Sequence, residues 1–175
     1  MKRWVYWLPF LVFTTLSIIA VVGLWRPADR TVRSALVGKP LPGFAMAPML
    51  PGKPGLDRAT FTRGKPRLLN IFASWCIPCA AEAPQLARLK AAGVAIDAVA
   101  IRDTPEAVRG FLDRYGDPYQ HIGSDPESSL QLALGSSGVP ETFVIDGNGT
   151  ILLQHVGEIR ADDVPDLLAA LGRAK

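Results

Sequence analysis

Four consecutive segments in the middle of the chain alternate between two apolar patterns. The runs 67–73 and 94–101 are almost continuously apolar, which is typical of buried strands, whereas 80–93 and 104–116 place apolar residues at helical spacing. A regular alternation of strands with helices favours a parallel sheet covered by helices. The sequence therefore predicts an α/β domain.

The segments on either side extend this domain. Short apolar pieces broken by Gly and Pro predict edge strands and turns, and a short helix that stops at Gly follows the second predicted helix. Two strands joined by Gly-Asn-Gly indicate a hairpin, and an amphipathic helix closes the chain. In chain order these segments are 37–66, 125–135, 141–146, 150–156 and 161–174. We expect one folded domain over 37–175.

The run from Trp4 to Trp25 contains 22 residues and no charged one. At about 1.5 Å of rise per residue, a helix of this length spans about 33 Å, close to the hydrocarbon core of a bilayer. Tyr6 and Trp7 add aromatic rings at one end, where headgroups favour them. We expect an uncleaved transmembrane signal-anchor helix over 4–25, with a cleaved signal peptide and a buried core helix as the alternatives.

The residues that flank this run do not fix its orientation. Residues 1–3 form a short N-terminus, and 26–36 carry mixed charge without periodicity, which indicates a linker. Lys2 and Arg3 precede the apolar run, but three arginines follow it within the linker, so the positive-inside bias does not choose a side. The compartment of the folded domain has to come from other features.

The overall charge argues against one class of partner. The net charge is +3 over 175 residues, and no run rich in Lys and Arg occurs. A nucleic-acid surface normally needs such a run or patch. We therefore expect no nucleic-acid partner.

The only two cysteines of the chain are Cys76 and Cys79, in the stretch NIFASWCIPC. A haem attachment site would need His after the second Cys, where Ala80 stands. A zinc or iron–sulfur site built from Cys alone needs four thiolates, and His121 and His155 lie far from the pair in sequence. We expect no metal site.

A redox role explains the local sequence. A strand that ends near Ala73 and a helix that begins near Ile77 place Cys76 at the junction, exposed at a helix N-terminus that stabilises a thiolate. Cys79 follows one turn later, faces inward and can release a mixed disulfide by attacking the Cys76 sulfur. Pro78 fits the first turn because it has no N–H to lose. A structural disulfide here would close a tiny loop and add little stability, so we interpret the pair as a catalytic dithiol.

Two further features are candidates for the same site. Glu82 lies three residues after Cys79 on the same helical face, where it either complements the helix dipole or relays a proton. In the segment GVPET, Pro140 is either an edge or turn residue or the site of a cis bond. A cis bond would turn the backbone of Val139 outward, where a substrate peptide could add as a strand.

The stretches LLNIFASWCIPCAAEAP and GVPETFVID together resemble the membrane-tethered thioredoxin-like proteins of bacterial cytochrome c maturation, the CcmG/DsbE family. The resemblance covers about residues 37–172, and the N-terminal anchor fits it. Asn70 stands where cytosolic thioredoxins typically have a buried Asp. Ser136 replaces a Val of the family pattern and Ala80 a frequent Arg, so the partner groove departs from that pattern while the redox pair does not.

The resemblance implies a thioredoxin-like fold with a central mixed sheet flanked by helices. It implies that Cys76 is the attacking thiol and Cys79 the resolving one, that the two form a redox-active disulfide, and that Pro140 is a cis proline beside the substrate. Glu82 and Glu141 resemble the acidic residues next to the dithiol. The residues expected to contact the substrate are Trp75, Ile77, Pro78, Val139, Glu141 and Thr142.

The resemblance also implies a function and a compartment. The domain would face the periplasm and reduce the haem-binding Cys-x-x-Cys-His of apocytochrome c, directly or through a CcmH-like partner. Electrons would come from a DsbD/CcdA-like transporter of the inner membrane, and no cofactor is needed beyond the two sulfurs. One alternative is a TlpA- or ResA-like reductase for another client, such as an oxidase copper site. A Sco-type copper metallochaperone is a remote alternative, since that family uses Cys-x3-Cys.

Overall fold

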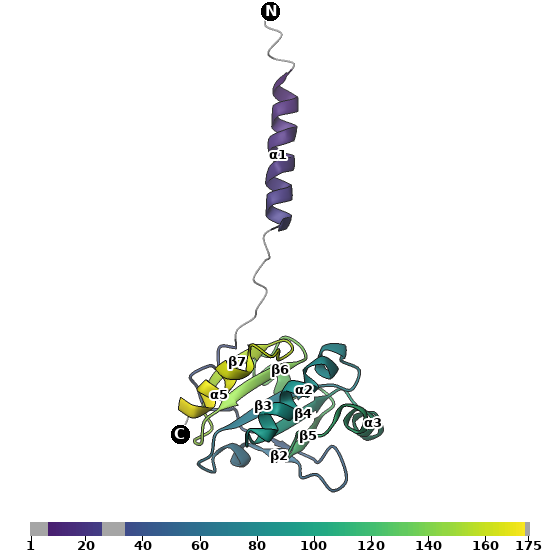
Figure 1. Cartoon of the computed structure of the whole chain (residues 1–175), viewed down its shortest axis with the longest axis vertical. Coiled ribbons are helices and arrows are strands. Elements are labelled where there is room, and N and C mark those ends of the chain that lie inside the picture. Colours follow the sequence, from purple (N-terminus) through teal and green to yellow (C-terminus); the bar gives the residue numbers. More distant parts are fainter. Residues whose placement is uncertain (1–6, 26–33, 174–175) are drawn as a thin grey trace, which may run out of the picture. The chain divides into compact units, whose positions relative to one another are not determined.

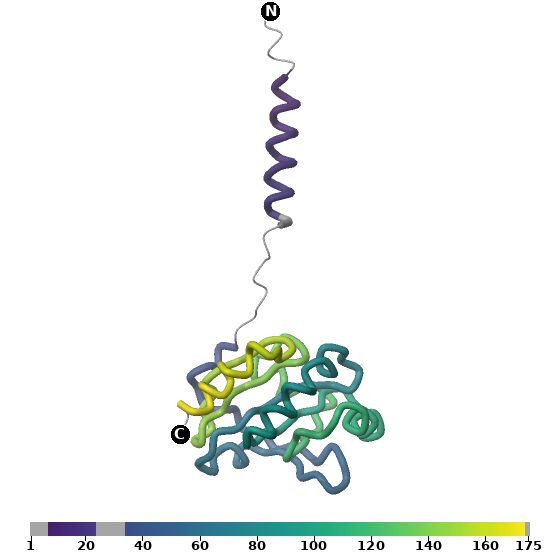
Figure 2. Tube along the Cα trace, in the orientation of Figure 1, coloured from purple at the N-terminus to yellow at the C-terminus, as the bar shows by residue number. Residues whose placement is uncertain are grey.

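The structure has two separate units. The computed structural model describes residues 7–25 and 34–173. One unit ends at Thr31 and contains helix α1 (Leu8–Trp25), and the other begins at Val32 and contains all the remaining elements (Figures 1 and 2). The second unit contains both cysteines.

Helix α1 falls inside the predicted anchor and contains 18 residues. Residues 4–6 of that anchor, the predicted N-terminus 1–3 and residues 26–33 of the predicted linker lie outside the described residues. Within the described ranges, no helix combines the length and the apolarity needed to cross a membrane.

A five-stranded sheet forms the centre of the domain, in the order β5-β4-β3-β6-β7 (Figure 1). The strands are β3 (Arg67–Phe72), β4 (Ile96–Ile101), β5 (Ile122–Asp125), β6 (Glu141–Ile145) and β7 (Ile151–Val156). The central strand β3 pairs in parallel with β4 on one side and antiparallel with β6 on the other, and β6 continues into the predicted hairpin with β7. The sheet is therefore mixed, as expected.

Helices pack on this sheet. They are α2 (Ile77–Ala91), α3 (Pro105–Tyr115), α4 (Ser129–Ala133) and α5 (Val164–Arg173). Helix α2 contacts both α3 and α5, and α5 also contacts β6 (Figure 1). The region predicted to contain edge strands and turns forms a two-stranded hairpin, β1 (Ala45–Met46) with β2 (Leu56–Asp57), which a short 3-10 helix η2 (Arg58–Phe61) follows. The alternation of strands and helices thus brings the N-terminus of α2 to the end of β3.

The edge strand β5 is an element that the apolar pattern did not predict. Its sequence, Ile-Gly-Ser-Asp, contains a single large apolar residue. It becomes a strand because it pairs with β4 and because Pro48 bridges to Gly123 on its other side. A Cβ at Gly123 would lie 3.0 Å from the Met46 side chain, so glycine allows this close approach. Tertiary packing, rather than periodicity, defines the strand.

A buried cluster of charged side chains lies at the end of the sheet opposite to the dithiol. The Arg67 guanidinium, at the start of β3, donates to both carboxylate oxygens of Asp97 on β4, at 2.5 and 2.8 Å. His121 Nδ1 lies 2.6 Å from Asp97 Oδ1. The Asp97 side chain is fully buried. Its charge is therefore satisfied entirely by neighbouring side chains.

We predict that Asp97→Ala destabilises the domain without changing its exchange chemistry. The substitution removes the carboxylate that Arg67 and His121 contact, and breaking a buried ion pair in this way typically costs about 3 to 5 kcal/mol. Urea unfolding should show this loss, while Asp113→Ala, on the exposed surface of α3, should stay within about 0.5 kcal/mol of the parent. Equal effects of the two substitutions would contradict a structural role for the cluster.

Candidate active site

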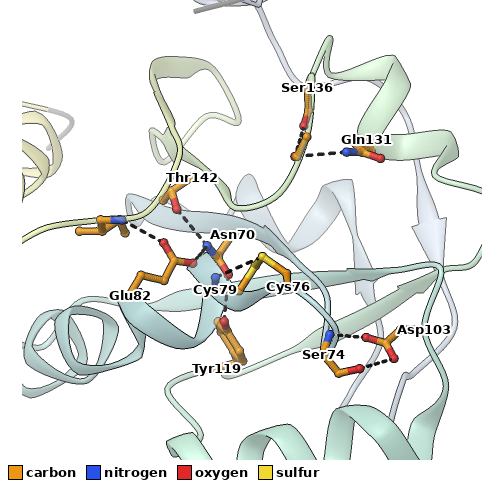
Figure 3. The surroundings of a disulfide bond; sticks show 12 residues. Asn70, Ser74, Cys76, Cys79, Glu82, Asp103, Tyr119, Gln131, Ser136 and Thr142 are labelled. Atoms are coloured by element: carbon orange, nitrogen blue, oxygen red, sulfur yellow. Dashed lines mark hydrogen bonds between the residues drawn. A yellow bond between two sulfur atoms is a disulfide. The ribbon is translucent and has the colours of Figure 1, made fainter.

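The two cysteines form a disulfide at the start of α2. Their Cα atoms lie 5.3 Å apart, and Cys76 is the N-cap residue of the helix (Figure 3). Its sulfur accepts the backbone N–H of Cys79 at 3.1 Å. Pro78 occupies the first turn, where no intrahelical donor is lost. The strand-to-helix junction thus lies where the sequence predicted it.

The expectation that Cys76 is exposed is wrong. In the oxidised pair Cys76 is 5% exposed and Cys79 2% exposed. The Cys76 sulfur turns into the first helical turn, where it bonds the Cys79 sulfur and accepts the Cys79 amide. The neighbouring Trp75 and Ile77 are 58% and 84% exposed instead. A partner therefore meets these apolar side chains before it reaches a sulfur.

The loop after β4 forms hydrogen bonds to the residues that precede Cys76. Asp103 accepts the Ser74 N–H at 2.5 Å and the Ser74 hydroxyl at 2.7 Å (Figure 3). The Trp75 indole N–H donates to the carbonyl of Arg102 at 3.2 Å. Asp103 was not among the predicted site residues. A signal was present, because Asp103 follows a predicted strand, and the ends of neighbouring parallel strands lie at the same edge of a sheet.

The segment GVPET lies beside the end of β3. The Val139–Pro140 peptide bond is cis, and β6 begins at the next residue, Glu141. Gln131 and Ser136 both donate to the carbonyl of Gly138, at 3.2 and 3.1 Å (Figure 3). Ser136, which departs from the family pattern, thus holds the backbone just before the proline.

The side chains of Glu141 and Thr142 are fully buried, which differs from the expectation that they contact a substrate. The Glu141 carboxylate accepts the N–H and the hydroxyl of Ser137 at 3.0 Å each, and the Gln154 amide at 3.2 Å. Thr142 accepts a hydrogen bond from Asn70. Both side chains therefore make hydrogen bonds inside the protein. Through its bonds to Ser137, Glu141 fixes the loop before Pro140.

Glu82 belongs to a buried hydrogen-bond network beneath the dithiol (Figure 3). Asn70 Nδ2 donates to Glu82 Oε1 at 2.9 Å and to Thr142 Oγ1 at 3.0 Å. The Tyr119 hydroxyl donates to Asn70 Oδ1 at 2.9 Å, and the Ile159 N–H donates to Glu82 Oε2 at 3.1 Å. We call these five residues the Glu82 network. Within this network, Glu82 lies on α2 one helical turn after Cys79.

Burial raises the pKa of Glu82 to about 7, because the charged carboxylate loses its hydration. The hydrogen bonds from Asn70 and from the Ile159 N–H oppose this rise, and the charge of Glu158 adds to it. Desolvation also raises the pKa of Tyr119 well above its usual value, so its hydroxyl stays protonated and acts as a donor. Near neutral pH, Glu82 can therefore either accept or release a proton.

We predict that Glu82→Gln changes the pH dependence of stability. The pKa of Glu82 rises from 4.5 in the unfolded chain to about 7 in the folded protein. The parent protein therefore loses stability as the pH rises from 4.5 to about 7, and this group causes no further loss at higher pH. Gln cannot ionise, so the variant should gain up to about 3 kcal/mol relative to the parent by pH 8. Urea unfolding of the oxidised proteins at several pH values measures this. Parallel curves would contradict the prediction, and Glu106→Gln on the surface of α3 is the control.

The histidines have partners away from the dithiol. His121 contacts Asp97, and His155 Nε2 lies 3.1 Å from the carbonyl oxygen of Glu158. Over residues 7–25 and 34–173, no group of three or more His, Cys, Asp or Glu side chains is placed to hold a metal ion.

A dithiol at a helix N-terminus, a cis proline beside it and a central mixed sheet define a thioredoxin-like thiol–disulfide oxidoreductase. Comparisons with known proteins identify the family within this class to which the chain belongs. The family model described as Redoxin matches residues 36–171. Thiol:disulfide interchange protein HelX of Rhodobacter capsulatus is 37% identical over 162 residues, which is 93% of this chain and 92% of HelX.

Two further relatives agree. Thiol:disulfide interchange protein DsbE of Pseudomonas fluorescens biotype C is 38% identical, over 97% of this chain and 94% of DsbE. A solved thiol:disulfide interchange protein from Chlorobium tepidum superposes with a TM-score of 0.61 at 26% identity, over 82% of this chain and 98% of that one. The chain belongs to the redoxin family, among the thiol:disulfide interchange proteins of the DsbE/HelX group. Its activity is thiol–disulfide exchange.

Proposed function

We propose that this protein is a periplasmic reductant of cytochrome c biogenesis. Its client is the haem-binding Cys-x-x-Cys-His disulfide of apocytochrome c, reached directly or through a CcmH-like thiol protein, and a DsbD/CcdA-like protein supplies the electrons. The observation that carries the proposal is a dithiol with the Glu82 network one turn behind it, in a chain of the DsbE/HelX group.

The proposed exchange has two steps. The Cys76 thiolate attacks one sulfur of the client disulfide, which forms a mixed disulfide and releases the other client sulfur as a thiolate that takes up a proton. The Glu82 carboxylate then accepts the proton of the Cys79 thiol. The Cys79 thiolate attacks the Cys76 sulfur, forms the intramolecular disulfide and releases the second client sulfur as a thiolate, which takes up a proton from solvent. Two electrons pass from the dithiol to the client.

The remaining site residues have proposed roles in docking. Trp75, Ile77 and Pro78 form an exposed rim around the dithiol. The half-buried Val139 precedes Pro140 at the edge where a client backbone can align as an added strand. Residues with buried side chains, such as Thr142, support this edge from inside.

We predict that Cys79→Ala accumulates mixed disulfides through Cys76. Without the resolving thiol, the second step cannot occur, so clients remain covalently bound. Non-reducing gels and mass spectrometry after alkylation of free thiols identify them. Apocytochrome c or a CcmH-like protein is the expected capture, whereas a copper-site protein would favour the TlpA/ResA-like alternative. Cys76→Ala is the matched control and should trap nothing, and an empty Cys79→Ala trap would contradict the proposal.

We also propose that 4–25 is a single-pass anchor in the bacterial inner membrane, with residues 1–3 in the cytoplasm, 26–36 as a linker and 37–175 in the periplasm. The uncharged run with aromatic residues at its ends supports this. All of the candidate site residues lie within residues 34–173.

We predict that the full chain stays with membranes after carbonate extraction, because its apolar segment is inserted, whereas a chain that begins at Ser34 is released. In spheroplasts, an impermeant thiol reagent should label the reduced cysteines of the full chain. Labelling only after lysis would place the domain in the cytoplasm and contradict the orientation.

A further inference from the structure

Tyr119 lies in the site, but neither step of the proposed exchange uses it directly. It is buried immediately before β5, and its ring packs against Phe72 with centroids 5.1 Å apart. Asp117 accepts its backbone N–H at 3.1 Å, and Lys53 Nζ donates to its carbonyl. Lys53 and Asp117 also form an ion pair at 2.6 Å. The backbone of Tyr119 is thus held on both sides while its hydroxyl points into the Glu82 network (Figure 3).

The hydroxyl of Tyr119 determines which way round the Asn70 amide stands. The two ends of an amide have nearly the same shape, so hydrogen bonds decide between them. The Tyr119 hydroxyl donates to Asn70 Oδ1, and this is its one hydrogen bond within residues 7–25 and 34–173. Asn70 must therefore turn its oxygen to Tyr119 and its Nδ2 group to Glu82 Oε1 and Thr142 Oγ1.

We propose that Tyr119 is a positioning residue for the proton transfer from Cys79, because it fixes the Asn70 amide as a donor that holds Glu82 as an ionised acceptor. This rests on the proton-accepting role proposed for Glu82. If the Asn70 amide were reversed, its oxygen would face Glu82. That oxygen can accept a hydrogen bond from a protonated Glu82 carboxyl, but it cannot donate one to the ionised carboxylate. Tyr119 therefore favours the form of Glu82 that can take a proton.

The other titratable groups around Glu82 do not replace this donor. Cys79 lies on the same helix, and Glu158, from the loop after β7, carries a like charge that disfavours ionisation. Tyr119 faces the network from the segment before β5 and stays neutral. Asn70 on β3 and the Ile159 N–H are the groups that donate to the carboxylate. Of these two donors, only the Asn70 amide can reverse.

Tyr119→Phe tests the proposal, since it removes only the hydroxyl and keeps the ring against Phe72. Losing part of one charge-assisted hydrogen bond should raise the pKa of Glu82 by about one unit. The rate at which Cys79 resolves the mixed disulfide should then rise with pH through a midpoint about one unit higher. We expect about tenfold slower resolution at pH 6 and no difference at pH 9.

The measurement uses the full-length reduced protein in detergent and an excess of a symmetric, uncharged peptide disulfide. Acid quenching and mass spectrometry follow the mixed disulfide on Cys76 from pH 5 to 9. Tyr115→Phe, in which the lost hydroxyl belongs to a 42% exposed tyrosine on α3, is the matched control and should leave the profile unchanged. Thr142→Val, which removes the other acceptor of Asn70 Nδ2, should shift the midpoint in the same direction and serves if Tyr119→Phe does not fold.

Glu82→Gln separates the two proposals. If its profile equals that of the parent, the proton-accepting role of Glu82 fails. If Glu82→Gln slows resolution at neutral pH but neither Tyr119→Phe nor Thr142→Val moves the midpoint, only the role of Tyr119 is overturned. A lower rate at every pH with an unchanged midpoint also overturns it, because a purely structural defect has that signature.

Discussion

The two-sided pairing of β3 is the constraint on which the rest of the domain depends. Its parallel partner β4 and its antiparallel partner β6 fix the positions of the Asp103 loop and of Pro140 relative to the dithiol. Asp103 follows β4, Pro140 precedes β6, and Cys76 follows β3 itself. A slip of β3 by one residue against both partners would turn Asn70 from the Glu82 network to the opposite face of the sheet. The chemistry therefore depends on backbone hydrogen bonds that lie several residues away from any sulfur.

A charged group beneath the dithiol opposes stability near neutral pH. A carboxyl group with no solvent exposure is favoured in its neutral form, and the network offsets only part of the cost of ionising it. An apolar residue at this position of α2 would pack without that cost. The ion cluster of Asp97 contrasts with it, because there a buried acid is matched by a bidentate guanidinium. One buried acid serves the fold, and the other is suited to moving protons.

The sequence carried the local features of the site but not its long-range ones. The strand-to-helix junction at Cys76 and the helical spacing of Glu82 follow from neighbours along the chain. Tyr119 lies 49 residues from Asn70, and the Ile159 amide lies 77 residues from Glu82, so no periodicity relates them. The burial of Cys76 escaped prediction for a similar reason, since a helix N-cap position does not reveal which way its side chain turns. Strand β5 was missed because its pairing partners, rather than its own residues, make it a strand.

The nearly complete burial of both sulfurs affects which thiols can reduce the disulfide. Small dissolved thiols reduce a disulfide by attacking one of its sulfurs directly, and the oxidised pair presents almost no sulfur surface to them. A protein thiol can first contact the exposed Trp75 and Ile77 side chains, which hold it beside the pair. The burial thus favours reduction of the disulfide by proteins that dock on this rim over reduction by small thiols.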